Sequence, residues 1–169
     1  ADGNAYFNAG SDTLQKYDPA TGQLAGVYAG MPGSQVLCAA GPDADGMLYG
    51  ITADTDTLFR FNPATGAFTT IATVEADTAA MAVDPTGAYV YYVPGADSAH
   101  GDGPLVQVNA STGAKRTIAN LAPYVLGAYG NALAGSKSLS VSDDGRVVYL
   151  QFNGQDPAGD APAFLAVHV

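Results

Sequence analysis

A ten-residue segment occurs three times in this 169-residue chain, and this repeat constrains the fold more than any other feature. The copies occupy residues 13–22, 57–66 and 104–113, and their closing glycines lie 44 and 47 residues apart. Each copy alternates its side chains as a half-buried strand does, and it ends in a turn whose glycine can take a positive φ. Because a second alternating stretch follows each turn, the repeat predicts a β-hairpin.

A second motif alternates with the first along the chain. In residues 80–93 and 138–151, and more loosely in 37–52, a strand of small residues reaches a turn that ends in glycine. A strand of β-branched and aromatic residues leaves that turn. Together the two motifs predict four-stranded antiparallel units, whose strands we letter A to D in chain order. The first unit lacks strand A and the last unit lacks strand D.

The chain is therefore predicted to be a single all-β module of four units. Their approximate bounds are residues 1–34, 35–76, 77–120 and 121–169. Composition agrees, because the acidic residues are fifteen Asp and only one Glu, and 21 Gly and 10 Pro favour turns over long helices. A net charge of −10 disfavours nucleic acid as a partner. No apolar run approaches the length of a membrane span, so we expect no membrane insertion.

Two patterns resemble those of known propeller families. One is Asp-Gly-x-x-x-Tyr on strand B, as in residues 144–149, and the other is Tyr/Phe-Asp/Asn-Pro-x-Thr-Gly on strand C, as in residues 17–22 and 61–66. They are similar to the YVTN, streptogramin-lyase-like and gluconolactonase-like β-propellers. The resemblance implies blades of four antiparallel strands in a ring of about six or seven blades. It does not imply one activity, because such blades carry lyases, lactonases and binding platforms.

Four units amount to about half of such a ring. Three interpretations follow: a segment of a longer propeller, a half-ring that another protein chain completes, or a small four-bladed ring. An open half-ring would expose apolar faces between blades, which soluble monomers rarely leave bare. The expected partner is therefore another protein chain or the remainder of a longer propeller.

Long insertions are predicted on one side of the sheets. Successive antiparallel strands place the A–B and C–D turns on one side, here called the turn side, and the B–C and D–A connections on the other, the connection side. The long insertions, residues 95–103, 120–137 and 154–161, all fall on the connection side. Since variable loops on a repeated scaffold often carry function, this side is the predicted ligand surface, for a small molecule or carbohydrate. Its predicted ligand-binding residues are Asp97, Asp102, Asn131, Lys137 and Asp156.

An enzyme is the alternative function. His100, flanked by Asp97 and Asp102, is the candidate acid or base, with Tyr124 or Tyr129 as its partner in a lyase or hydrolase. The competing interpretation is a solvated Gly/Asp loop. The gluconolactonase-like families hold a divalent metal with a Glu, Asn and Asp set. Here the single Glu75 begins a D–A connection and the A strands offer Ala, Ser and Cys, so the residues do not support that activity.

Calcium is the cofactor that the aspartates suggest, because Ca²⁺ prefers several hard oxygen ligands. Asp97, Asp102, Asp156 and Asp160 are the candidate ligands, with Asp12, Asp54 and Asp56 in other connections. Aspartate is equally an ordinary residue of turns and soluble surfaces. The sequence thus favours a secreted or periplasmic binding or scaffold component, with an enzyme, or a subunit that completes a propeller with another chain, as alternatives.

Overall fold

The computed structural model is built from fourteen strands, and its described residues contain no helix. The structure describes residues 3–75, 78, 80–94, 104–121, 137–154 and 161–169. Within these residues there is accordingly no apolar helix of membrane-spanning length. The chain is all-β, as the repeats predict.

The strands form four antiparallel sheets, one for each predicted unit. Unit 1 contains β1 (Ala5–Asn8), β2 (Thr13–Asp18) and β3 (Gln23–Ala29). Unit 2 contains β4 (Val36–Ala40), β5 (Leu48–Thr52), β6 (Thr57–Asn62) and β7 (Ala67–Thr73). Unit 3 contains β8 (Ala80–Val83), β9 (Tyr89–Val93), β10 (Leu105–Asn109) and β11 (Lys115–Ala119). Unit 4 contains β12 (Lys137–Val141), β13 (Val147–Gly154) and β14 (Ala161–His168).

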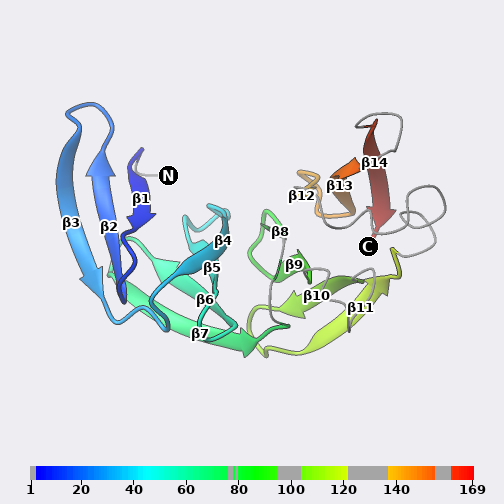
Figure 1. Cartoon of the computed structure of the whole chain (residues 1–169), viewed down its shortest axis with the longest axis horizontal. Helices are drawn as coiled ribbons and strands as arrows, with labels where there is room; N and C mark the ends of the chain where they lie inside the picture. The colour runs from blue at the N-terminus through cyan, green and yellow to red at the C-terminus, as the bar shows by residue number, and fades with distance from the viewer. Residues whose placement is uncertain (1–2, 76–77, 79, 95–103, 122–136, 155–160) are drawn as a thin grey trace.

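The four sheets follow one another as the blades of an open arc (Figure 1). The first strands of units 2 to 4, β4, β8 and β12, lie on the inner side of the arc, and β3, β7 and β11 lie on the outer side. Inner strands of neighbouring units contact each other, β4 with β8 and β8 with β12. This arrangement is that of a β-propeller segment and confirms the predicted fold class.

The hydrophobic core lies between the sheets, in three layers. Alternate residues of a strand point to opposite faces, so each sheet contributes one apolar face to the preceding unit and one to the next. Three clusters of buried side chains result: Leu14 with Phe59 and Phe61 between units 1 and 2, Ile51 and Leu58 with Val90 and Val108 between units 2 and 3, and Val93 and Leu105 with Val148 and Leu150 between units 3 and 4. Each sheet is therefore stabilised mainly by its neighbours.

The A–B turns position one unit against the next. Gly46 and Gly87 occupy equivalent turn positions with φ of 78° and 72°, and each donates its N–H to the carbonyl of the aspartate that opens its turn, Asp43 or Asp84. A Cβ atom on Gly87 would lie 2.1 Å from Oδ2 of Asp43 in the preceding unit and 2.8 Å from the Tyr49 hydroxyl. At Gly46 a Cβ atom would meet nothing within 4 Å.

This difference makes the two glycines a matched pair for mutagenesis. Gly46→Ala has only the left-handed backbone to overcome, so we expect it to lower the free energy of unfolding by about 1 to 2 kcal/mol. Gly87→Ala also displaces the Asp43 carboxylate, so we expect this variant to lower the free energy of unfolding by at least about 3 kcal/mol. Urea unfolding measures both values, and equal losses would contradict the close contact between units 2 and 3.

Candidate binding cleft between the first two units

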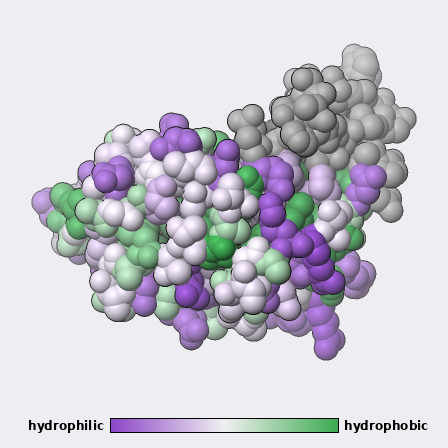
Figure 2. Space-filling view, turned by 90° about the horizontal axis from the view of Figure 1, so that it is seen from below, coloured by the Kyte–Doolittle hydropathy of each residue, from purple (hydrophilic) through white to green (hydrophobic). Residues whose placement is uncertain are grey.

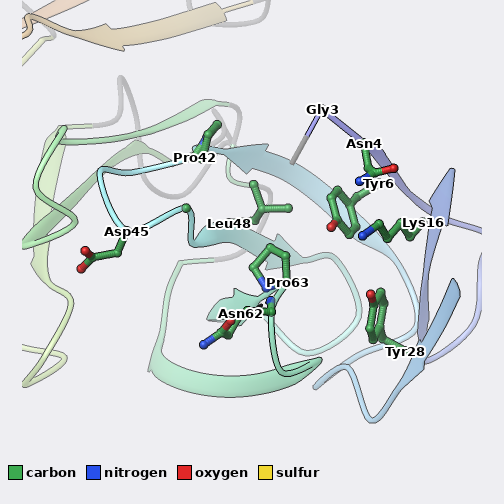
Figure 3. Close-up of a pocket in the computed structure, with 12 residues that line it drawn as sticks. Gly3, Asn4, Tyr6, Lys16, Tyr28, Pro42, Asp45, Leu48, Asn62 and Pro63 are labelled. Atoms are coloured by element: carbon green, nitrogen blue, oxygen red, sulfur yellow. Dashed lines mark hydrogen bonds between the residues drawn. The ribbon is translucent and has the colours of Figure 1, made fainter. Parts of the chain in front are cut away.

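A cleft of about 640 Å³ lies between units 1 and 2, on the turn side of the sheets. Figure 3 shows Asn4, Tyr6, Lys16 and Tyr28 of unit 1 on one wall and residues of unit 2 on the other. The unit 2 wall comes from the A–B turn, the start of β5 and the C–D turn. Its residues are Pro42, Asp45, Gly46, Leu48, Asn62, Pro63 and Ala64.

Two tyrosine rings on the unit 1 wall of this cleft pack against Phe61 of unit 2. The ring of Tyr28 lies 5.0 Å from that of Phe61, and the ring of Tyr6 lies 5.7 Å from it, both in edge contacts. Lys16, the cross-strand partner of Tyr6, places its Nζ 6.0 Å from the centre of the Tyr6 ring, within range of a cation–π contact. The unit 1 wall therefore combines an aromatic surface, a phenol hydroxyl and a positive charge.

The equivalent position between units 2 and 3 is filled by a carboxylate. Tyr49 and Arg60 are cross-strand partners in unit 2, as Tyr6 and Lys16 are in unit 1. The Tyr49 hydroxyl donates to Oδ2 of the buried Asp43 at 2.7 Å and lies 3.3 Å from the carbonyl oxygen of Gly87. Burial, followed by the hydrogen bond to Asp43, raises the pKa of Tyr49. Tyr49 is thus a fixed hydrogen-bond donor that links two units.

Between units 3 and 4 the same positions hold a polar chain. Tyr91 and Gln107 are cross-strand partners, and the Gln107 amide donates to the Tyr91 hydroxyl at 2.9 Å. Nε of Arg116 donates to the Gln107 carbonyl oxygen at 2.7 Å. Oδ2 of Asp84 lies 3.9 Å from the Cβ position of Gly145, so a turn carboxylate again approaches the glycine of the next unit.

A second polar cluster joins unit 2 to unit 3. The Glu75 carboxylate, which follows β7, accepts a hydrogen bond from the Tyr92 hydroxyl and forms an ion pair of 2.9 Å with Nζ of Lys115. Glu75 and Lys115 border a cleft of about 240 Å³ with Pro94, Pro104 and Val106. Burial opposes ionisation of Glu75, but the hydrogen bonds from Tyr92 and Lys115 outweigh it and hold the pKa of Glu75 below its usual value. The single glutamate therefore acts as a contact between units.

Most of the sequence-predicted site residues lie outside the described part of the chain. This holds for the acid–base candidates His100, Tyr124 and Tyr129 and for the predicted ligands Asp97, Asp102, Asn131, Asp156 and Asp160. The backbone of Lys137 begins β12, but its side chain is not described. Their roles in catalysis, ligand binding and calcium binding stay predictions.

Asp54, one of the additional calcium candidates, has a structural role. Its carboxylate accepts hydrogen bonds from the backbone N–H and the hydroxyl of Ser34, both at 2.8 Å. These bonds hold the pKa of Asp54 below its usual value. Among the residues that the structure describes, no three His, Cys, Asp or Glu side chains are grouped so that they could hold a metal ion.

Sequence reasoning did not anticipate the cleft of Figure 3. It lies beside the short turns, whereas the predicted ligand surface is on the connection side. The available signal was the tyrosine of strand B, which recurs as Tyr6, Tyr49, Tyr91 and Tyr149. Its significance depends on which turn of a neighbouring unit faces it, and a single strand pattern does not contain that information.

Comparison with known proteins supports the architecture. No family model matches the chain, and no curated protein does. A solved structure of hydrazine synthase from Kuenenia stuttgartiensis is similar, with a TM-score of 0.68 and 14% sequence identity over 99% of this chain. The match covers 47% of the hydrazine synthase chain, so this chain spans less than half the length of that protein. At this identity the similarity shows a propeller-like fold alone, and the resemblance to the YVTN, streptogramin-lyase-like and gluconolactonase-like families stays a prediction.

The Glu75 cluster gives a pH-dependent prediction. Because the pKa of Glu75 is lowered in the folded chain, its stabilising contribution is present above the usual value of 4.5 and is lost as the pH falls below it. The side chain is 40% exposed, so solvent screening limits the contribution to about 1 kcal/mol. We expect Glu75→Gln to lower the free energy of unfolding by that amount at pH 7.

Chemical unfolding of the wild type and of Glu75→Gln between pH 7 and pH 3 measures the difference between their free energies of unfolding. It should shrink steadily below pH 4.5. Lys115→Met provides the control, since it should remove only the ion-pair part of the effect. A difference between wild type and Glu75→Gln that stays constant over this range would show that the charge of Glu75 does not contribute.

Proposed function

We propose that the chain is a scaffold and interaction subunit of a β-propeller, and that the outer sheet face of unit 1 packs against a blade of a second chain. The observation that carries this proposal is the exposure of three apolar side chains on one face. Phe7, Leu24 and Val27 are 56%, 50% and 55% exposed. Figure 2 shows hydrophobic residues at the surface of the end formed by unit 1, at the left of the view.

Strand register places these residues on one face. Phe7 pairs with Gln15, which pairs with Val27 on the other side, and the next row of the same face contains Ala5, Tyr17 and Leu24. The rings of Phe7 and Tyr17 are in edge contact at 5.7 Å. Leu14 points to the opposite face, where it packs on unit 2. The face of Phe7, Leu24 and Val27, here called the outer face of unit 1, therefore points away from unit 2.

The same face is buried in the other units. Phe59 and Phe61 occupy it in unit 2, where they pack against Leu14 of unit 1 and are 3% and 0% exposed. Val108 of unit 3 and Val148 of unit 4 are likewise fully buried against the preceding unit. Because this face is buried in units 2, 3 and 4, a further blade is the partner that fits the outer face of unit 1.

The opposite end of the arc presents the complementary face, the one that a following unit would cover. Tyr149 of β13 and Phe164 of β14 stack at 5.7 Å on the face of unit 4 that points away from unit 3, and Phe164 is 69% exposed. The two end faces are of different types, since one normally meets a preceding unit and the other a following unit. Association between copies is therefore expected to be head to tail.

Sedimentation velocity over a range of concentrations tests the proposal. We expect the wild-type chain to self-associate, because burying apolar surface at about 25 cal/mol per Å² favours the complex. The double variant Leu24→Lys with Val27→Lys should weaken association at least about tenfold without a loss of folding stability, because both residues are exposed.

Leu37→Lys is the matched control. Leu37 is also exposed, at 43%, but it lies on β4 and away from the outer face of unit 1. The control should associate like the wild type. A wild-type chain that stays monomeric at every concentration, or a double variant that associates as strongly as the wild type, would contradict the proposed function.

A further inference from the structure

We propose that the cleft between units 3 and 4 on the turn side binds a neutral sugar unit, one hydroxyl of which bridges Tyr91 and Asp84. The site is separate from the outer face of unit 1 and does not depend on self-association. Three observations carry it: a buried phenol whose proton has no acceptor in the described residues, a turn carboxylate that stands back from the next unit, and a cleft that combines hydrogen-bond donors with acceptors.

The cleft has a volume of about 290 Å³. This is far more than the roughly 30 Å³ that one water molecule occupies, and it is close to the lower limit of about 300 Å³ for small-molecule sites. One wall is the face of unit 3 that carries Tyr91, Gln107 and Arg116, which are cross-strand neighbours on β9, β10 and β11. The A–B turns of units 3 and 4 border the cleft, as does Val169, and the groups proposed to hold the ligand lie within residues 84–144.

The first observation is the hydroxyl of Tyr91. Tyr91 is only 1% exposed, and its oxygen accepts a hydrogen bond from the Gln107 amide at 2.9 Å. Nε of Arg116, which can only donate, bonds to the Gln107 carbonyl oxygen at 2.7 Å and so fixes the amide nitrogen towards Tyr91. The Tyr91 proton must therefore point elsewhere, and the described residues provide no acceptor for it. Buried polar groups nearly always have partners, so this proton indicates an acceptor in the cleft.

The equivalent tyrosine of unit 2 has its acceptor within the chain. Tyr49 occupies the same register position as Tyr91, and its hydroxyl donates to Oδ2 of Asp43 at 2.7 Å. That carboxylate lies tightly against unit 3, with Oδ2 only 2.1 Å from the Cβ position of Gly87. A tyrosine, a turn carboxylate and the next unit are thus in direct contact at the junction of units 2 and 3.

The second observation is that Asp84 does not make this contact. Its Oδ2 lies 3.9 Å from the Cβ position of Gly145 and accepts a hydrogen bond from the Thr86 hydroxyl at 2.9 Å. Its Oδ1 accepts from the backbone N–H of Tyr89 at 3.2 Å. Both oxygens retain capacity for another donor, because a carboxylate oxygen has two lone pairs. The junction of units 3 and 4 is therefore wider here, and a ligand group fits between the phenol and the carboxylate.

A hydroxyl group is the ligand group that satisfies both sides. It accepts from the Tyr91 phenol and donates to the Asp84 carboxylate. A carboxylate or phosphate would accept from Tyr91 but would be repelled by the aspartates of both turns, Asp84, Asp143 and Asp144. An ammonium group would pair with these aspartates but cannot accept a hydrogen bond. The arrangement therefore favours a neutral polyol over an anion or a cation.

The third observation concerns the other groups of the cleft. The terminal NH₂ groups of Arg116 have no acceptor among the described residues, so they are available to a ligand oxygen. Asp143 and Asp144 face them from unit 4 as acceptors. Tyr89 lies two residues before Tyr91, hence on the same side of β9, and its side chain is 36% exposed. An aromatic ring beside paired donors and acceptors suits a sugar, which has an apolar C–H face and a rim of hydroxyls.

Saturation-transfer difference NMR on the full chain tests the site, with the methyl pyranosides of glucose, galactose and mannose as probes. We expect at least one of the three to bind with a Kd of about 1 mM. Sodium acetate and methylammonium chloride at equal concentration should not displace it, because neither carries a hydroxyl.

A pair of arginine variants locates the binding. Arg116→Gln should weaken binding of the sugar at least about threefold through the lost charge-assisted hydrogen bonds, and the exposed position should let the variant fold normally. Arg146→Gln is the matched control, since Arg146 is also exposed but does not line the cleft. It should bind the sugar like the wild type.

A pair of tyrosine variants separates binding from stability. Tyr91→Phe should weaken sugar binding at least about fivefold, because it removes the hydroxyl that holds the ligand. Tyr49→Phe removes the equivalent hydroxyl of unit 2 and leaves the buried Asp43 carboxylate without this donor. It should lower the midpoint of thermal unfolding more than Tyr91→Phe does and leave sugar binding unchanged.

The double variant Leu24→Lys with Val27→Lys should bind the sugar normally, so that a failure of self-association and a failure of sugar binding are distinguishable. The proposal is wrong if none of the three sugars binds at about 10 mM, which would mean that the cleft holds water alone. It is also wrong if acetate or methylammonium displaces the sugar, or if Tyr91→Phe and Arg116→Gln bind the sugar as strongly as the wild type.

Discussion

Contact between the faces of successive sheets is the interaction on which the rest of this structure depends. A sheet of three or four short strands buries little by itself, and most of its apolar side chains are covered only when another sheet lies against them. The fully buried residues Phe61, Val90 and Leu150 all belong to layers between units. As in other repeat architectures, stability is then a property of the junctions more than of the units. A unit at the end of the arc consequently retains one face of the kind that its neighbours bury.

Polar contacts determine how the sheets are aligned. Apolar faces alone would allow neighbouring sheets to slide, because hydrophobic contact is not directional. The bonds from Tyr49 to Asp43 and from Tyr92 and Lys115 to Glu75 join unit 2 to unit 3 at separate places. The junction of units 1 and 2 also has a buried aromatic layer, but its described residues contain no equivalent of Asp43. The cleft of Figure 3 lies at this junction, on the turn side of the sheets.

The fold could be predicted from the sequence because its signals are local. Alternation of period two identifies strands, and the closing glycines such as Gly22, Gly66 and Gly113 adopt the positive φ that their turns require. The cleft could not be predicted in this way, because Tyr6 and Gly46 belong to different units and meet only through packing. The number of repeats predicts exposed apolar faces for an open half-ring, but the alternation around Phe7 is that of a buried strand and does not single this residue out. His100 and the other residues of the connection side lie outside the described residues, so their predicted chemistry is neither supported nor contradicted.

Hydroxyl-radical footprinting by mass spectrometry tests the central claim, that the outer face of unit 1 is a blade-packing face, most directly. In the dilute chain, oxidation of the exposed Phe7 should greatly exceed that of the buried Phe61, which occupies the same face of unit 2. In the associated form, oxidation of Phe7 should fall towards the level of Phe61, whereas Leu37 should stay reactive. If Phe7 remains as reactive in the associated form as in the dilute chain, the end face does not receive another blade and the account is wrong.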